Sequence, residues 1–220
     1  MSSTTIETSS SIERDKNPTT VVTIGRRTID SVLIGIGLLA TVVCAIAGGL
    51  LTWGNNFSSD YVRSELASQN ISFPTKEALT TEGRTDLVKW GGNKVDTGKE
   101  AQAYASYING HLEKIASGAT FADLGTPERA ANADLKAATA AGAPKAQLDE
   151  LKAKADTITG QRNTLFKGET LRGLLLTAYA WSTVGSIAGI AAVVAFVAAG
   201  LMAVLVVLGL MHHARTPKLT

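Results

Sequence analysis

Two long stretches of the chain contain no charged residue: Ser31 to Ser59 and Gly173 to Ala214. A bilayer core takes about 20 apolar residues of helix to cross, so each stretch is long enough to span a membrane. The segment between them is polar, with acidic and basic residues in balance. The sequence therefore predicts an all-α membrane protein. Two transmembrane helices, residues 29–53 and 181–211, are expected to flank a mainly helical extracytoplasmic domain of residues 54–180.

The first stretch has the composition of an inserted helix. Leu, Ile, Val and Phe each contribute about −0.3 to −0.6 kcal/mol at the centre of a span, whereas a charge there costs about 2.5 to 3.5 kcal/mol. The segment from Val32 to Leu51 contains many of these apolar residues and no charged residue. Asp30 precedes the span and Trp53 follows it, and both side chains suit a membrane interface.

The second stretch is about twice as long as a span requires. Its better membrane core runs from Ile187 to Met211, and Trp181 is expected at the outer interface, mirroring Trp53. Apolar residues are then left above the headgroups, and either the chain's own helices or a partner must cover them. These residues are Leu171, Leu174, Leu175, Leu176 and Tyr179. A hairpin of two short spans is not favoured, because no Pro or polar turn divides the stretch.

Basic residues flank the two spans on one side. Arg26 and Arg27 precede the first span, and Arg215 and Lys218 follow the second. The positive-inside tendency therefore places both termini in the cytoplasm and the central domain outside the plasma membrane. Long loops, however, translocate largely regardless of their charge.

The two ends of the chain are expected to be cytoplasmic tails, residues 1–28 and 212–220. The first is rich in Ser and Thr and predicts a flexible segment, unless a neighbouring protein orders it. A competing interpretation makes the start of the chain a cleaved export signal, with Ala45-Ile46-Ala47 as the cleavage site. The apolar run continues to Leu51, which favours a retained anchor.

Composition excludes several classes of protein. The net charge of +2 comes from bases that alternate with acids, whereas nucleic-acid binding needs a clustered basic face. The only cysteine, Cys44, lies inside the first span, so the outer domain has no disulfide and must hold together by helix packing or through a partner. The expected partners are membrane lipids and other membrane protein subunits, not nucleic acid or a small-molecule substrate.

Within the central segment, residues 54–98 carry several Gly and one Pro between short apolar clusters. They predict irregular structure with a helical turn near residues 76–79. Helical periodicity then begins. An apolar stripe at spacings of three and four predicts a helix that stops near Gly118. The stripe consists of Ala101, Tyr104, Ile108, Leu112 and Ile115.

Two further helices are predicted beyond Gly118. Thr126-Pro127-Glu128 has the pattern of a helix start, with Thr as the cap and Pro at the first helical position. This Ala-rich helix should end around Ala141-Gly142, and Ala143-Pro144 should begin the next. The next helix has a short coiled-coil-like seam, which Gly160 and Arg162 interrupt, so a helical hairpin is expected. The seam is formed by Leu148, Leu151, Ala155, Ile158 and Leu165. Gly168 and Gly173 leave open whether this helix continues into the second span.

No pattern for catalysis, a cofactor or a metal is present. The chain has no paired cysteines, no Gly-rich phosphate loop and no Gly-x-Ser-x-Gly motif. His111 lies one residue from the apolar stripe and is expected at its edge. His212 and His213 are expected at the cytoplasmic interface, with proton transfer or haem ligation as the alternative role. As neighbours on a helix they point about 100° apart and share no metal face. An enzymatic interpretation would require a retained metal or cofactor.

Small residues in both spans offer surfaces for close helix packing. Gly37, Thr41, Ala45 and Gly49 recur every four residues in the first span. In the second span, Gly185 and Gly189 form a pair that Ala192, Ala195 and Ala199 continue. These faces are expected to pack the two spans on each other, on another subunit, or both.

Two segments of the chain resemble a known family. The run from Ala103 to His111, Ala-Tyr-Ala-Ser-Tyr-Ile-Asn-Gly-His, and the run from Ala116 to Leu124, Ala-Ser-Gly-Ala-Thr-Phe-Ala-Asp-Leu, are similar to a segment of small actinobacterial two-span membrane proteins. The pattern around Leu171-Arg172 is similar as well. Those proteins are sometimes labelled aromatic ring-opening dioxygenases, but no iron site can be assembled here. The chain departs from the family by an inserted Ala- and Lys-rich hairpin over residues 130–154.

The size and layout also resemble the accessory subunits of the actinobacterial respiratory supercomplex, in which a cytochrome bc complex joins cytochrome c oxidase. This resemblance implies a noncatalytic accessory subunit that docks through its spans and presents a helical domain outside. The alternative is a stand-alone cell-envelope protein whose outer domain binds a ligand or a wall component.

Overall fold

The computed structural model describes residues 26–215, and of Arg26 the backbone only. The predicted flexible tail lies almost wholly outside these residues, as does Lys218. The described chain is helical and holds one isolated β-bridge, between Ser72 and Lys94. The prediction of an all-α fold is confirmed for this part of the chain.

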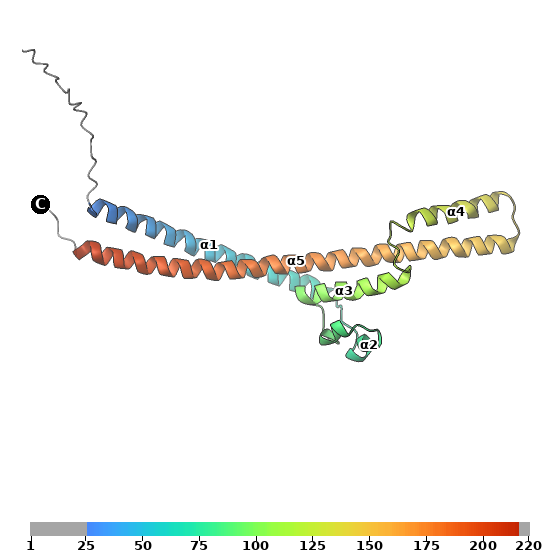
Figure 1. Cartoon of the computed structure of the whole chain (residues 1–220), viewed down its shortest axis with the longest axis horizontal. Helices are drawn as coiled ribbons and strands as arrows, with labels where there is room; N and C mark the ends of the chain where they lie inside the picture. Colours follow the sequence, from blue (N-terminus) through green and yellow to red (C-terminus); the bar gives the residue numbers. More distant parts are fainter. Residues whose placement is uncertain (1–25, 216–220) are drawn as a thin grey trace, which may run out of the picture.

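Two long helices dominate the molecule. Helix α1 spans Arg26–Ser68 and helix α5 spans Lys145–Arg215. They run antiparallel and side by side, and Figure 1 shows the rod that they form. With 71 residues, α5 is about 107 Å long at 1.5 Å per residue. Both helices are long and apolar enough to cross a membrane, and only 11% and 17% of their most apolar windows are buried.

Helix α1 continues well beyond the first apolar stretch, to Ser68. The prediction of irregular structure is therefore wrong for residues 54–68, although it is correct from Gln69 onward. Ser58, Val62 and Leu66 are buried at four-residue intervals in this extension. Packing along one helical face, rather than local propensity, keeps these residues helical.

Helix α5 is unbroken from the outer end of the molecule to the other end of the rod. The question that Gly168 and Gly173 left open is thus answered by one continuous helix. Gly168 has a packing role, because a Cβ there would lie 2.4 Å from Leu112 Cδ2. Of the apolar residues predicted to need cover, Leu175 is buried and Tyr179 is half-buried, whereas Leu171, Leu174 and Leu176 stay exposed.

A small subdomain follows α1. It contains helix α2, Lys76–Thr81, and the 3₁₀ helix η1, Thr85–Trp90, and the predicted helical turn near residues 76–79 is confirmed by α2. Leu79 is completely buried inside it. A larger core joins the subdomain to the long helices and consists of Val62, Leu66, Phe73, Val95, Ala101, Ala105 and Leu175.

Helix α3, Gly98–Ile115, begins with a capping box in which the Thr97 side chain and the Glu100 carboxylate satisfy each other's backbone N–H groups. Of the predicted stripe, Ala101 and Leu112 are buried and the other three residues are half-buried, and Ala105, outside the prediction, is buried as well. The helix stops as predicted, and Gly118 takes the left-handed φ of +85° just after it.

Helix α4, Gly125–Ala140, pairs with the start of α5 as the predicted hairpin, and Gly142 at φ +68° turns the chain between them. The predicted cap is wrong, because the helix begins at Gly125 and Thr126 makes no capping bond. A hydrogen-bonded turn precedes the helix instead. The Asp123 carboxylate accepts from Thr120 N at 2.9 Å, and Thr120 Oγ1 accepts from Asp123 N at 3.2 Å.

Candidate functional site

The seam between α1 and α5 is built on glycine. A Cβ added at Gly37 would lie 2.8 Å from Val206 Cγ2, and one at Gly185 would lie 2.8 Å from Ser58 Cβ. At Gly189, a Cβ would lie 3.0 Å from the Asn55 side chain. Four residues singled out from the sequence, Gly37, Thr41, Gly185 and Gly189, thus lie along this contact.

Ala45 and Gly49 do not belong to the seam. Both are exposed, and nothing lies within 4 Å of a Cβ built at Gly49. Gly48 takes that place instead, since its Cβ would lie 2.9 Å from the Phe196 ring. On α5, Gly185, Ala192, Ala199 and Val206 are buried at seven-residue intervals, the repeat of a left-handed helix pair. The exposed small face of Ala45 and Gly49 remains a predicted surface for another subunit.

The register of the seam fixes the levels of the two tryptophans. Gly37 lies opposite Val206, Gly48 opposite Phe196, and Ser58 opposite Gly185. The Ser58 hydroxyl also donates to the Trp181 carbonyl oxygen at 2.7 Å. In this register Trp181 lies about nine residues, or about 13 Å, further along the rod than Trp53. The sequence predicted that the two indoles lie at the same level, and the register of the helices shows that they do not.

An aromatic ladder on α1 fills this interval. The rings of Trp53 and Phe57 stack at 5.6 Å between centroids, and those of Phe57 and Tyr61 stack at 6.1 Å. All three side chains and Trp181 are exposed. Trp and Tyr are amphipathic, and their rings spread over such a distance are typical of a headgroup layer rather than of a sharp boundary.

The opposite end of the rod carries a polar cluster formed by Arg27, Asp30, His212 and His213. Arg27 Nε, Asp30 Oδ2 and His213 Nδ1 are buried and accept or donate no hydrogen bond within the described chain. A cavity of about 270 Å³ beside the cluster is lined by Asp30, His212 and apolar residues of both helices. Arg27 and Arg215, two of the predicted interface anchors, mark this end, where Arg215 is exposed. Arg26 begins α1 there.

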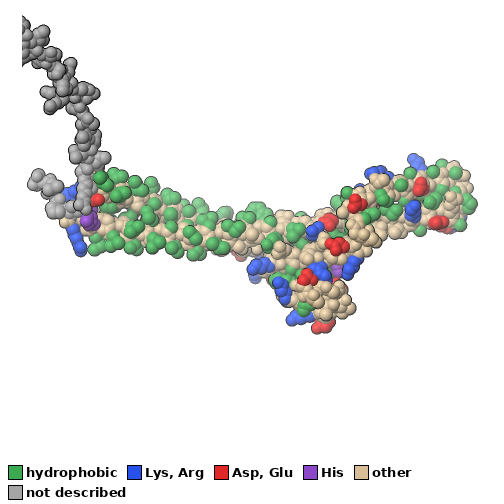
Figure 2. Space-filling view, viewed as in Figure 1, with side chains coloured by type: hydrophobic (Ala, Val, Ile, Leu, Met, Phe, Trp, Pro, Cys, Tyr) green, Lys and Arg blue, Asp and Glu red, His purple; other side chains and the backbone are tan. Residues whose placement is uncertain are grey.

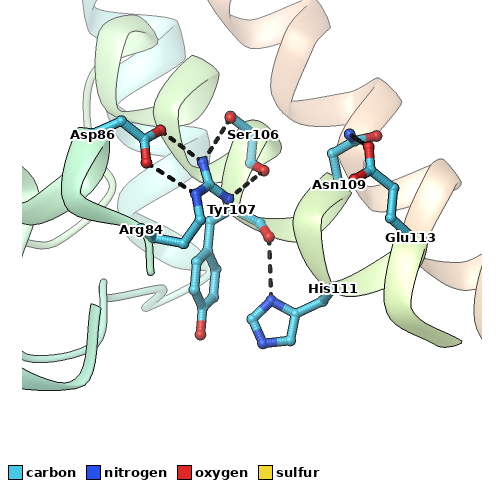
Figure 3. Close-up of polar contacts among 7 residues, drawn as sticks. All are labelled: Arg84, Asp86, Ser106, Tyr107, Asn109, His111 and Glu113. Atoms are coloured by element: carbon cyan, nitrogen blue, oxygen red, sulfur yellow. Dashed lines mark hydrogen bonds and ion pairs between the residues drawn. The ribbon is translucent and has the colours of Figure 1, made fainter. Parts of the chain in front are cut away.

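The outer part of the molecule, residues 69–180, lies beyond the seam, and its polar side chains centre on Arg84 (Figure 3). Its guanidinium donates to both Asp86 carboxylate oxygens, at 3.0 and 2.8 Å, and to the Ser106 carbonyl oxygen and hydroxyl, at 2.9 Å each. This pairing ties η1 to α3. The hydrogen bond from Arg84 lowers the pKa of Asp86, and the same bond raises the pKa of Arg84.

Tyr107 and His111 lie beside this pair on α3. The Tyr107 hydroxyl donates to Glu82 Oε1 at 3.5 Å, and burial, followed by the Glu82 charge, raises the Tyr107 pKa. The His111 and Tyr107 rings lie 4.5 Å apart between centroids and are tilted at 60°. His111 Nδ1 lies 3.2 Å from the Tyr107 carbonyl oxygen, and its Nε2 lies 3.9 Å from Glu82 Oε2. His111 is exposed, so the ring lies at the edge of the stripe, where the sequence placed it.

The outer part carries two open grooves. One, of about 410 Å³, lies between η1, α3 and Tyr179 of α5. The other, of about 480 Å³, lies beside the α3–α4 connection and includes Glu113, Phe121 and Glu169. Over residues 26–215, no group of three or more His, Cys, Asp or Glu side chains is arranged to hold a metal ion. None of the network around Arg84 was identified from the sequence, because its members come from segments whose contacts only the fold defines.

Comparison with known protein families, with curated proteins and with solved structures finds no match to this chain. The geometry of the rod and of the outer part therefore carries the functional argument.

Proposed function

We propose that this chain is a two-span membrane protein that serves as a noncatalytic accessory subunit of a membrane complex. The first support is the exposure of the rod. Figure 2 shows apolar side chains covering it from the polar cluster at Asp30 towards the outer part. So large an exposed apolar surface is energetically unfavourable for a monomer in water, whereas lipid solvates it.

The charges on α1 match the thickness of a bilayer. Asp30 and Asp60 bracket a segment of α1 without any other charged residue. They lie 30 residues apart, which corresponds to about 45 Å of helix. A bilayer with its headgroup layers is about 40–45 Å thick. In this placement Asp30 reaches one headgroup surface and Asp60 the other.

The basic ends support a cytoplasmic location for both termini. Arg27 and Arg215 lie at the Asp30 end of the rod, and basic residues favour the cytoplasmic side. The outer part then projects from the opposite surface, at the outer face of the plasma membrane. From Gly185 to Lys145, α5 extends about 60 Å beyond the membrane.

The topology can be tested with single cysteines on a Cys44→Ala background. Ala141→Cys at the far turn should react with a membrane-impermeant maleimide in intact cells. Ala214→Cys at the other end should react only after lysis. The reverse pattern would place the termini outside, and equal labelling of both sites in intact cells would contradict membrane insertion.

The observation that carries the accessory role is apolar surface beyond the outer headgroups. Leu174 and Phe166 on α5 are 64% and 57% exposed there, and Leu171 is also exposed. The chain's own helices leave these residues uncovered, which favours contact with another protein. The sequence resemblance suggests the supercomplex of a cytochrome bc complex with cytochrome c oxidase as the first assembly to test.

Extraction from native membranes in mild detergent, followed by affinity purification and protein identification, tests this role. The chain should elute in a large assembly with defined subunits. Leu174→Glu should release the assembly, whereas Asn163→Glu, which adds the same charge to an exposed site of α5, should not. Elution of the unaltered chain as a monomer would contradict the proposal and favour a stand-alone envelope protein.

A further inference from the structure

The geometry points to a binding site for the headgroup of an anionic phospholipid, in the groove between η1, α3 and α5. Basic and aromatic side chains and one hydroxyl line this groove, which has a volume of about 410 Å³. They include Lys89, Lys99, Trp90, Tyr179 and Ser106. The inference rests on the membrane insertion proposed above.

The groove lies at the level of the outer headgroups. A Cβ at Gly98, the first residue of α3, would lie 2.3 Å from Ser182 Cβ and 3.3 Å from Tyr179 Cα. The Ser58 hydroxyl bonds to the neighbouring Trp181 carbonyl oxygen, and Asp60 lies two residues beyond Ser58. Lys99, the second residue of α3, therefore lies close to the plane that Asp60 marks, and α3 leads away from the membrane.

The ammonium groups of the two groove lysines are available to bind an anionic ligand. No salt bridge to Lys89 or Lys99 exists among residues 26–215. Lys89 Nζ lies 5.2 Å from the centre of the Trp90 ring. Figure 2 shows Lys and Arg side chains gathered on the edge of the small subdomain that is nearest the apolar rod.

The acids beside the groove are already engaged. Arg84 holds both oxygens of Asp86, a groove residue. The Glu100 carboxylate accepts from Asp96 N, Thr97 N and Thr97 Oγ1, at 3.2, 3.0 and 2.8 Å. On α1, Asp60 and Arg63 carry opposite charges close to this level. Among the residues that line the groove, Lys89 and Lys99 therefore stand against a single acid, Asp86, which Arg84 already pairs, and the lining carries a positive excess.

A phosphodiester fits this excess, because its oxygens accept from ammonium groups and its charge is opposite. A lipid whose headgroup also carries an ammonium group would bring a like charge close to the lysines. The site should therefore prefer phosphatidylglycerol to phosphatidylcholine. The half-buried Trp90 and Tyr179 add the amphipathic rings typical of a membrane interface.

A fluorophore beside the groove tests the inference in the full chain. On a Cys44→Ala background, Asn93→Cys places the label next to Lys94 and near Trp90, where Asn93 uses only its backbone in hydrogen bonds. The protein is reconstituted into vesicles of phosphatidylcholine with increasing phosphatidylglycerol that carries a headgroup quencher. Quenching should saturate at a low fraction of phosphatidylglycerol and should weaken with salt.

Lys89→Gln and Lys99→Gln should each raise the half-saturating fraction about fivefold, as expected for one lysine at an anionic surface. Lys154→Gln and Lys167→Gln, which remove exposed lysines of α5 away from the groove, should leave the half-saturating fraction unchanged. Quenching that is linear in quencher and insensitive to Lys89→Gln and Lys99→Gln would overturn the headgroup site.

A second label separates this failure from failure of membrane insertion. Leu50→Cys, on the exposed face of α1, should be quenched by acyl-chain-brominated lipid in every vesicle. If Leu50 is quenched and Asn93 shows no lipid preference, only the headgroup site is wrong. If Leu50 is not quenched, the membrane proposal itself is wrong.

Discussion

Helix α5 packs through small buried residues in the rod and against larger side chains in the outer core. In the rod, the buried positions of α5 are Gly185, Ala192, Ala199 and Val206; Gly37 of α1 faces Val206, and Ser58 faces Gly185. In the outer core, the cluster that includes Leu175 of α5, larger side chains such as Phe73 and Leu66 are buried instead. The proposed membrane insertion accounts for this difference. Lipid supplies no hydrophobic drive between helices, so close backbone approach provides the contact energy there, whereas water drives large apolar groups inward.

This comparison predicts that the outer core is the more sensitive to loss of volume. Phe73 stacks on Trp90 at 6.3 Å and meets the Tyr104 ring edge-on at 5.2 Å. Phe73→Ala should cost about 3–5 kcal/mol in the free energy of unfolding of this region. Hydrogen exchange should accelerate over residues 71–107 and stay slow along the rod. Equal acceleration in both regions would show that they unfold as one unit.

The rod should be more sensitive to added volume. Gly185→Leu forces a side chain against Ser58 and should cost about 1–3 kcal/mol in the free energy of unfolding, measured by denaturant titration in detergent micelles. Gly49→Leu makes the same change where no atom lies within 4 Å and should leave that free energy nearly unchanged. If Gly49→Leu strongly lowered the free energy of unfolding of the isolated chain, the proposed position of the seam would be wrong. If it did so only within an assembly, the exposed face around Gly49 would be a contact with another subunit.

A smaller effect is expected at the upper end of the seam, where Ser58 provides the interhelical hydrogen bond to Trp181. Ser58→Ala should cost about 0.6 kcal/mol in the same titration, a typical value between membrane helices. Thr52→Ala is the control, because the Thr52 hydroxyl bonds to Gly48 within its own helix. A cost for Thr52→Ala as large as that for Ser58→Ala would argue against a specific interhelical contribution.

Local signals made most of the fold predictable. The three-and-four spacing from Ala101 to Ile115, and the glycines at 118 and 142, depend only on nearby residues, and α3 and the hairpin follow them. The extension of α1 to Ser68 was not predictable in this way, since Gly54 and its polar neighbours disfavour a helix. There the long-range burial of Val62 and Leu66 against α5 overrides local propensity.

The seam was predicted only in part, for a geometric reason. Residues spaced by four drift about 40° around a helix at each step, so a line from Gly37 through Thr41 leaves the contact by Ala45. The contact in the structure instead repeats every seven residues, so Gly48, seven residues after Thr41, lies in it. The levels of Trp53 and Trp181 depend on this register, which one sequence does not specify. The Arg84 network likewise joins residues that are 22 positions apart.

The smallest expected effect concerns pH and only the outer part. Asp86 has a pKa below its ordinary value of 3.8, because Arg84 donates to it. A carboxyl with a lowered pKa in the folded state adds stability above its unfolded pKa, and that stability is lost as the pH falls through the folded value. Acidification below pH 3.8 should therefore weaken the contact between Asp86 and Arg84 and loosen the start of η1. Asp86→Asn should remove this pH dependence while slightly destabilising the contact at neutral pH. Hydrogen exchange of residues 84–90 measures both effects.

The seam should not respond to the same change in pH, because α1 has no carboxylate between Asp30 and Asp60. If the seam loosened together with η1, the two regions would not respond to pH independently.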